Sequence, residues 1–222
     1  YLGFKVNSGE YKVMGLAPYG KPIYKDLILD NLIDLKDDGS FKLNMSFFNF
    51  ATGLTMTNKK FDNLFGQPAK TKEDELLTQF HMDIASSVQA VTEEVVLRLT
   101  KEIAKEYNVK NLCMAGGVAL NCVANGKILK NKIFENIWIQ PAAGDAGGSL
   151  GAALAYWHQE LGNKRKTNPK DSMKGSYLGP SFENSVIEKE LISLKATFKK
   201  HSEEDLTNIL AKKLSAEKTV GW

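Results

Sequence analysis

Cysteine is scarce in this sequence, and neither a long apolar run nor an excess of one charge is present. The two cysteines, Cys113 and Cys122, are too few for a disulfide framework and are typical of a reduced, cytoplasmic protein. No apolar stretch reaches the roughly 18 residues of a membrane-spanning helix, and no signal peptide is recognisable. The 29 basic and 26 acidic residues are interspersed, so the net charge of +3 does not indicate a nucleic-acid-binding surface. We therefore expect neither a membrane nor a nucleic-acid partner.

The chain nevertheless has enough apolar residues to form a core. Its 222 residues are 43% hydrophobic and 25% charged, as in soluble globular proteins, and allow one large domain or one domain and part of another. The first residue is Tyr1 rather than methionine, and the last residues, 219–222, have the pattern of a strand. We expect the chain to be a piece of a longer protein.

The most informative stretch, residues 109–161, predicts an α/β fold with two strand–turn–helix units in succession. The first apolar run leads into Gly116 and Gly117, and the second leads into the glycine-rich turn 143–148. Glycine lets a ligand approach the backbone, and the start of a helix offers free N–H groups to an anion. The two turns together therefore predict a nucleotide or phosphate site.

The remaining segments predict mainly helices. A short helix is expected from Glu10 to Leu16, ending before Pro18, and the sequence 37–40 is typical of a hairpin turn between strands 32–35 and 41–43. We expect a surface connection over 51–72, a long helix over 72–107, helices over 182–194 and 202–214, and strands over 196–199 and 218–222.

The long helix should bury one apolar stripe, because its large apolar residues recur every three or four positions. His81, beside this stripe, is expected to be a hydrogen-bonded structural residue rather than a metal ligand. Gln89 and Glu93, four residues apart, either face a cleft or form an ordinary polar helix surface. The stripe comprises Leu76, Leu77, Phe80, Ile84, Val88, Val91, Val95 and Leu99.

Several candidate binding residues allow a structural interpretation as well. Glu10 and Lys12 either face a ligand or occupy a solvent-exposed first helical turn, where the helix dipole favours Glu10. Asp145 is either an N-cap or a ligand, and a carboxylate has acceptor sites enough for both roles. Cys122 is expected to be a small buried hydrophobe. Gly147, Gly148 and Gly151 could instead be close-packing positions on a helix.

Residues 162–176 are polar, basic and poor in apolar side chains, as linkers are. We therefore expect one domain over 1–165, a linker over 166–176 and an incomplete second α/β domain over 177–222. The elements predicted in this last segment are too few to bury a core alone.

Five motifs follow one another along the chain: GEYKVMGLAPYG, HMDIASSVQAVTEEV, CMAGGVALNCVANGKI, QPAAGDAGGSLGAAL and YLGPSF. In this order they resemble the O-carbamoyltransferase family, whose members modify nodulation factors and several antibiotics. The family is similar in turn to the proteins that form threonylcarbamoyladenosine on tRNA, within the actin-like ATPase and sugar kinase superfamily. The resemblance implies that 1–165 is the C-terminal lobe of an actin-like, ribonuclease-H-like domain and that 177–222 begins a carbamoyl-adenylate-forming domain.

The resemblance also implies an activity: transfer of a carbamoyl group from carbamoyl phosphate, through carbamoyl adenylate and with ATP, to a hydroxyl of a small-molecule or glycan acceptor. It implies that Asp145 holds a divalent metal, expected to be iron, together with two histidines of an HxxxH motif. The chain's three histidines, at 81, 158 and 201, are not spaced in that way. Gly116, Gly117 and Asn121 match the adenosine motif and Glu10 a ribose-binding glutamate; with Lys12, Gly147 and Gly148 they are the expected nucleotide site.

Two other functions stay open from the sequence. One is a small-molecule kinase of the same superfamily, and the other is a non-catalytic nucleotide-binding module. The sequence indicates no general base, acceptor or oligomeric state, and we expect the chain alone to be inactive.

Overall fold

The computed structural model describes residues 1–71, 76–168, 170, 173 and 176–221. The chain divides into two compact units, Tyr1–Pro169 and Lys170–Trp222. Helices and two small sheets make up the first unit, which is the α/β content that the sequence predicts. None of the described helices is both long and apolar enough to cross a membrane.

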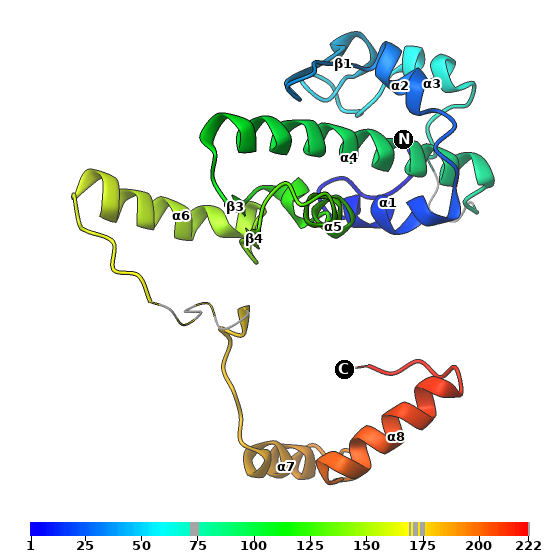
Figure 1. The fold of residues 1–222 in the computed structure, drawn as a ribbon. Coiled ribbons are helices and arrows are strands. Elements are labelled where there is room, and N and C mark those ends of the chain that lie inside the picture. Colours follow the sequence, from blue (N-terminus) through cyan, green and yellow to red (C-terminus); the bar gives the residue numbers. More distant parts are fainter. Residues whose placement is uncertain (72–75, 169, 171–172, 174–175, 222) are drawn as a thin grey trace. The chain divides into compact units, whose positions relative to one another are not determined.

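The first unit is built around one long helix, α4 (Gln79–Tyr107). In Figure 1, β1, α2 and α3 lie on one side of α4, and α1, α5, β3 and β4 lie on the other. Besides α4, the unit includes α1 (Glu10–Leu16), α2 (Lys25–Asn31), β1 (Ile33–Leu35), β2 (Phe41–Leu43), α3 (Lys59–Phe65), β3 (Asn111–Met114), α5 (Cys122–Lys130), β4 (Asn136–Ile139) and α6 (Gly148–Ala155).

Two apolar clusters use different faces of α4. In the larger cluster, Ile84, Val91 and Val95 of α4 pack with buried residues of α1, α2, β1 and α3. In the smaller one, Val96 packs with Ala124, Ile128 and Phe134. Five of the eight predicted stripe residues lie on α4 and pack against the larger cluster, and Leu77 packs there just before the helix begins, whereas Leu76 and Val88 are exposed. A single stripe does not describe α4, because a helix between two layers buries two faces.

Helix α4 begins later than predicted. Residues 76–78 are not helical, and 72–75 lie outside the described residues. Thr78 is extended and is the N-cap, and its backbone N–H donates to Nδ1 of His81 over 3.1 Å. This bond satisfies a donor that the helix start leaves without a partner. His81 is therefore the structural residue that the sequence predicts.

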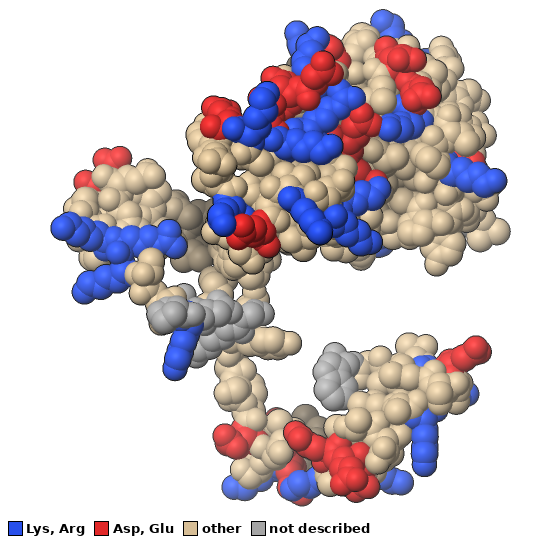
Figure 2. Space-filling model, in the orientation of Figure 1, with Lys and Arg blue, Asp and Glu red and all other residues tan. Residues whose placement is uncertain are grey.

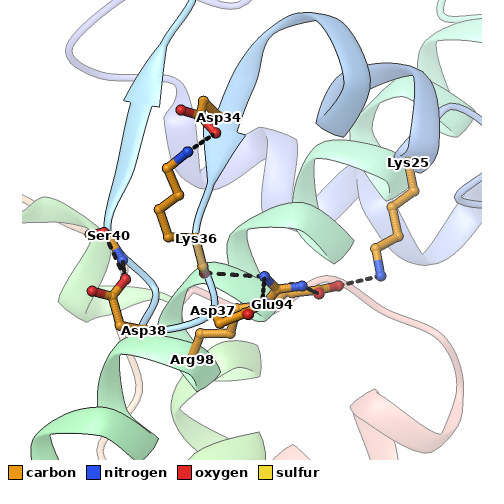
Figure 3. Close-up of polar contacts among 8 residues, drawn as sticks. All are labelled: Lys25, Asp34, Lys36, Asp37, Asp38, Ser40, Glu94 and Arg98. Atoms are coloured by element: carbon orange, nitrogen blue, oxygen red, sulfur yellow. Dashed lines mark hydrogen bonds and ion pairs between the residues drawn. The ribbon is translucent and has the colours of Figure 1, made fainter.

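The β1–β2 hairpin forms in the predicted place, with Ile33 opposite Leu43 and Leu35 opposite Phe41. Its turn is attached to α4 by Arg98, which donates to the carbonyl oxygen of Lys36 over 3.1 Å and also pairs with Glu94 (Figure 3). A cation from a neighbouring helix thus holds the hairpin against α4.

The predicted surface connection over 51–72 is wrong over α3, and its last residue lies outside the described residues. Asn58 caps this helix by accepting from the backbone N–H of Lys60 over 2.9 Å. Phe61 and Phe65, one turn apart, are buried against Tyr1, with ring centroids 4.8 and 5.8 Å away. The two aromatic residues make this segment part of the core despite its polar composition.

Strands β3 and β4 form a parallel pair, with Asn111 opposite Asn136 and Met114 opposite Ile139. Each strand leads through a glycine turn into a helix, α5 after β3 and α6 after β4, as predicted. A short π-helical turn, Tyr156–Glu160, continues α6. Because parallel strands run in the same direction, both turns leave the sheet at one edge.

Among its described residues, the second unit has the helices α7 (Asn184–Ser193) and α8 (Glu203–Ser215). The predicted cap of α8 is present, since Ser202 Oγ accepts from the backbone N–H of Asp205 over 3.1 Å. The strands predicted over 196–199 and 218–222 are wrong for the residues that the structure describes; residue 222 lies outside them. No described residue of this unit is buried, so its apolar side chains have no core to enter.

Candidate functional site

The two glycine turns are joined directly by the backbone. The N–H of Gly116 donates to the carbonyl oxygen of Ala143 over 2.7 Å, and the N–H of Gln140 donates to the carbonyl oxygen of Met114 over 3.1 Å. The parallel ladder therefore continues from the strands into the turns. This edge, at the carboxyl ends of parallel strands, is where α/β proteins commonly bind ligands.

The first turn requires glycine at one position and leaves space at the next. Gly116 has φ +107°, which side-chain-bearing residues rarely adopt. A Cβ built at Gly116 or at Gly117 meets no described atom within 4 Å. Gly117 begins a short 3₁₀ helix, Gly117–Leu120, whose first N–H groups have no partner within the helix. Open space above free backbone donors suits a bound nucleotide.

The second turn is tighter. A Cβ at Gly147 would lie 2.1 Å from the carbonyl oxygen of Ala142, so close packing requires glycine there. The close-packing interpretation is wrong for Gly148 and Gly151, where a Cβ would meet no described atom within 4 Å. The N–H groups of Gly147 and Gly148 donate to the carbonyl oxygens of Gly144 and Asp145. Neither glycine has a free donor; Gly148 leaves space for close approach, whereas Gly147 is required by the packing of the turn.

Asp145 is the exposed first residue of the 3₁₀ turn Asp145–Gly147, and Gly144 is the N-cap. The N-cap interpretation of Asp145 is therefore wrong. Within the described part of the chain its carboxylate makes no hydrogen bond or ion pair, so it is available to a ligand. The described residues contain no group of three or more His, Cys, Asp or Glu side chains that could hold a metal ion. One carboxylate does not fit a complete divalent-metal site.

Asn121 connects the first turn to α4. Its Oδ1 caps α5 by accepting from the backbone N–H of Ala124 over 3.1 Å. The same oxygen accepts from Nε2 of Gln89 over 3.1 Å, and Asn121 Nδ2 donates to Gln89 Oε1 over 2.9 Å. Sequence reasoning did not predict this pair, because it joins residues 32 positions apart.

Glu93 extends this connection one turn along α4. It is buried, accepts from Gln89 Nε2 over 2.9 Å and forms an ion pair with Lys127 of α5. A buried carboxylate needs such partners, because loss of hydration otherwise destabilises its charge. The alternative of an ordinary polar surface is therefore wrong for Gln89 and Glu93.

Asn125, also on α5, supports the first turn from beneath. It is buried, and its Nδ2 donates to the carbonyl oxygen of Ala119 over 2.7 Å. Its Oδ1 has no hydrogen-bond partner among the described residues. Sequence reasoning did not single out Asn125, because a polar residue within a helix gives no signal of burial.

Glu10 and Lys12 lie in the first turn of α1 and are exposed. Glu10 Oε1 accepts from the backbone N–H of Asn7, in the segment before the helix, over 2.6 Å. No hydrogen bond or ion pair in the described structure joins either side chain to the glycine turns.

The cysteines lie near the first turn, and both are free and exposed. The prediction of a buried Cys122 is wrong, because α5 turns its Ala124 and Ile128 towards α4 and leaves Cys122 at the surface. Of the histidines, His158 interacts through Nδ1 with the carbonyl oxygen of Asn163 over 2.8 Å.

Two carboxyl groups of α4, those of Asp83 and Glu94, have lowered pKa values. The backbone N–H of Lys21 and the side chain of Gln79 donate to Asp83 and lower the pKa of its carboxyl. Lys25, 2.5 Å away, and Arg98 likewise lower the pKa of Glu94 (Figure 3). Basic and acidic side chains are interspersed over the face in Figure 2.

A hollow of about 360 Å³ follows α4. It is lined by Glu93, Glu94 and four basic residues, Lys25, Arg98, Lys101 and Lys127, together with Ala90 and Leu97. It does not include either glycine turn.

Comparison with known proteins identifies relatives of the chain. A family model described as "Carbamoyltransferase N-terminus" matches residues 1–154, which include both glycine turns and α4. The chain is 60% identical, over its full length, to the uncharacterized protein sll1178 of Synechocystis sp., of which it covers 36%. It is 33% identical to the nodulation protein NolNO of Sinorhizobium fredii and 32% identical to the nodulation protein NolO of Bradyrhizobium diazoefficiens. These alignments cover 100% and 96% of this chain and 30% and 36% of the relatives, so the chain spans about a third of their length.

Proposed function

Because this chain belongs to the carbamoyltransferase family, whose model matches residues 1–154, we propose that the whole protein transfers a carbamoyl group to a hydroxyl of a small-molecule or glycan acceptor. The proposed donor is carbamoyl phosphate, and ATP activates the carbamoyl group as carbamoyl adenylate. This chain contributes the part of the transfer domain that holds the nucleotide. We expect it to be inactive alone, because it spans about a third of its relatives.

The joined glycine turns are the observation that carries the proposal. Two helices begin at one edge of a parallel strand pair, and the Gly116–Ala143 hydrogen bond keeps the turns together. Gly117 has space above its backbone. An adenylate is a nucleotide with a charged phosphate, and this arrangement offers it backbone donors and helix N-termini.

In the proposed site, the backbone at Gly116 and Gly117 contacts the nucleotide, and Asn121 hydrogen-bonds it. Gly148 lets the phosphate approach the second turn closely, and Gly147 allows the turn to take this closed form. Glu10 would bind the ribose hydroxyls, and Lys12 would lie beside the phosphates. The exposure of both α1 side chains is compatible with these contacts.

The fold proposed for residues 1–165 is the C-terminal lobe of an actin-like domain, followed by a linker and the start of an adenylate-forming domain. The parallel β3–β4 pair flanked by α4 and α5 supports this assignment. Two strands are too few for an independently stable sheet, so further strands would come from the rest of the protein.

In the transfer step, the acceptor hydroxyl oxygen would attack the carbamoyl carbon. The bond between that carbon and the phosphate oxygen of AMP would break, AMP would leave, and the hydroxyl proton would pass to solvent. The chain's own residues bind and orient the adenylate. Correct positioning of the two reactants supplies a large part of the rate acceleration. No side chain of this chain is assigned as a general base.

A divalent metal, proposed to be iron, belongs to the whole protein rather than to this chain alone. Asp145 would be one of its ligands, and two histidines from other parts of the protein would complete the set. When bound, such a metal would polarise an acyl or phosphate oxygen. No step above depends on it.

The proposal is tested with the full-length protein, labelled carbamoyl phosphate, ATP and an oligosaccharide acceptor. We expect ATP-dependent labelling of the acceptor with release of AMP. The Gly117→Val variant should fold and lose both nucleotide binding and transfer, since the branched side chain would occupy the space above the turn. Transfer of a phosphoryl instead of a carbamoyl group to the acceptor would refute it.

A further inference from the structure

Asn121 has little hydrogen-bonding capacity left for a ligand. Its Oδ1 accepts two hydrogen bonds, from Ala124 N–H and from Gln89 Nε2, which uses both lone pairs. One Nδ2 hydrogen goes to Gln89 Oε1. A single N–H remains, so in this arrangement Asn121 can act on a ligand only as a donor, towards an acceptor such as a ring nitrogen or a sugar oxygen.

The Ala124 N–H already fixes which terminal atom of Asn121 is the oxygen. Gln89 occupies the second lone pair of that oxygen and one Nδ2 hydrogen, and Glu93 in turn determines the orientation of Gln89. A carboxylate can only accept, so the amide group of Gln89 near Glu93 Oε1, 2.9 Å away, must be the NH₂. The other Nε2 hydrogen then donates to Asn121 Oδ1, and Gln89 Oε1 accepts from Asn121 Nδ2. Lys127 neutralises Glu93 at the far end.

This network is separate from the apolar contact between the two helices. Val96 of α4 packs with Ala124 and Ile128 of α5, and Ala124 and Ile128 are almost completely buried. That contact already holds α5 against α4. In addition, the polar network fixes the orientation of the Asn121 side-chain amide beside the first glycine turn.

We propose that Gln89, oriented by Glu93, is a positioning residue of the nucleotide site that holds the Asn121 amide as a donor to the ligand. The inference rests on the proposed function, in which the Gly116–Gly117 turn binds the nucleotide. Gln89 itself need not touch the ligand. Its effect on affinity is exerted through Asn121.

The test is a double-mutant cycle on ATP affinity in the full-length protein. Calorimetry measures the class of ATP sites that Gly117→Val removes, because the proposed adenylate-forming domain binds ATP as well. We expect Gln89→Ala and Asn121→Ala each to weaken ATP binding by about five- to tenfold, the worth of one hydrogen bond. The double variant should be no weaker than Asn121→Ala alone, because Gln89 acts through Asn121. Losses that multiply would overturn the proposal. If Gln89→Ala does not fold, Gln89→Met, of similar length, replaces it.

Two further variants separate orientation from helix packing. Gln89→Glu keeps the size but cannot donate to Asn121 Oδ1, and it places a carboxylate beside Glu93; it should weaken ATP binding at least as much as Gln89→Ala. Glu94→Gln disrupts the ion pairs of α4 with Lys25 and Arg98 and should leave ATP affinity unchanged. An equal loss in Glu94→Gln would mean that any damage to α4 weakens binding, and would refute a specific role for Gln89.

Gly117→Val distinguishes failure of this inference from failure of the proposed function. If Gly117→Val abolishes ATP binding at this turn and Gln89→Ala leaves it unchanged, only the proposed role of Gln89 is wrong. If Gly117→Val, correctly folded, removes no class of ATP sites, the nucleotide site is not at this turn and both proposals fail.

Discussion

The backbone N–H of Gly116 donates to the carbonyl oxygen of Ala143 over 2.7 Å and so joins the two glycine turns. Residues 27 positions apart thereby become one surface at the edge of the β3–β4 pair (143 − 116 = 27). A change in either turn should therefore affect the other. The turns nevertheless differ, since the first has open space above its glycines and the second is closely packed at Gly147.

Gly116 and Gly117 should respond differently to alanine. Gly116→Ala forces a side-chain-bearing residue to φ +107°, at a cost on the order of 1–3 kcal/mol. Gly117→Ala enters open space in a helical conformation and should leave the unfolding free energy nearly unchanged. Urea denaturation of both variants tests this. Equal stability of the two variants would contradict the strained backbone at Gly116.

Gly147 and Gly148 form a second matched pair. A methyl group at Gly147 would lie 2.1 Å from the carbonyl oxygen of Ala142, so Gly147→Ala must displace the turn. Gly148→Ala meets no described atom and removes a flexible residue from the start of α6, which should be neutral or stabilising by up to about 1 kcal/mol. Thermal melting should show a lowered Tm only for Gly147→Ala. A lowered Tm in both variants would indicate that α6 packs against something at Gly148.

Asp145 should affect metal content but not stability. Its carboxylate is exposed, is not the N-cap and has no partner in the described structure, so Asp145→Asn and Asp145→Ala should both melt within a few degrees of the unaltered protein. In the full-length protein both variants should lose most of the bound metal, measured by elemental analysis, and most of the transfer activity. Carbamoyl-adenylate formation should continue. Normal metal content in Asp145→Ala would remove Asp145 from the ligand set.

Asp83 should make the unfolding free energy depend on pH in the acidic range. Its folded pKa lies below the ordinary value of 3.8, chiefly because the Lys21 N–H and Gln79 donate to the carboxylate. Its contribution is therefore fully present above the unfolded pKa and is lost as the pH falls from about 4 through the folded pKa. Urea denaturation between pH 3 and 6 should show that, as the pH falls, the unfolding free energy decreases less in Asp83→Asn than in the unaltered protein. Parallel curves would show that Asp83 does not contribute.

Glu94 should contribute to the same pH dependence of the unfolding free energy. Lys25 and Arg98 also lower the pKa of Glu94, so its charge should be lost over the same acidic range. The variant Asp83→Asn, Glu94→Gln should be less dependent on pH than either single variant, because the two carboxylates have different partners.

Features with a local signal could be predicted from the sequence. Turn chemistry located the β1–β2 hairpin, and apolar runs that end at glycines located β3 and β4. The N-cap of α8 at Ser202 was also predicted from its local sequence. The motifs around Gly116 and Asp145 resembled the carbamoyltransferase family, to which the match over residues 1–154 assigns the chain. Each of these signals lies within a short stretch of sequence.

The tertiary structure decided the features that depend on distant residues. The pairing of Gln89 with Asn121 spans 32 positions, and the clash that requires glycine at 147 depends on how its turn is closed. Burial of Phe61 and Phe65 required Tyr1, and the exposure of Cys122 followed from the face that α5 turns towards α4. Periodicity and turn chemistry act over about ten residues, whereas the environment of a side chain is set by whichever elements pack against it.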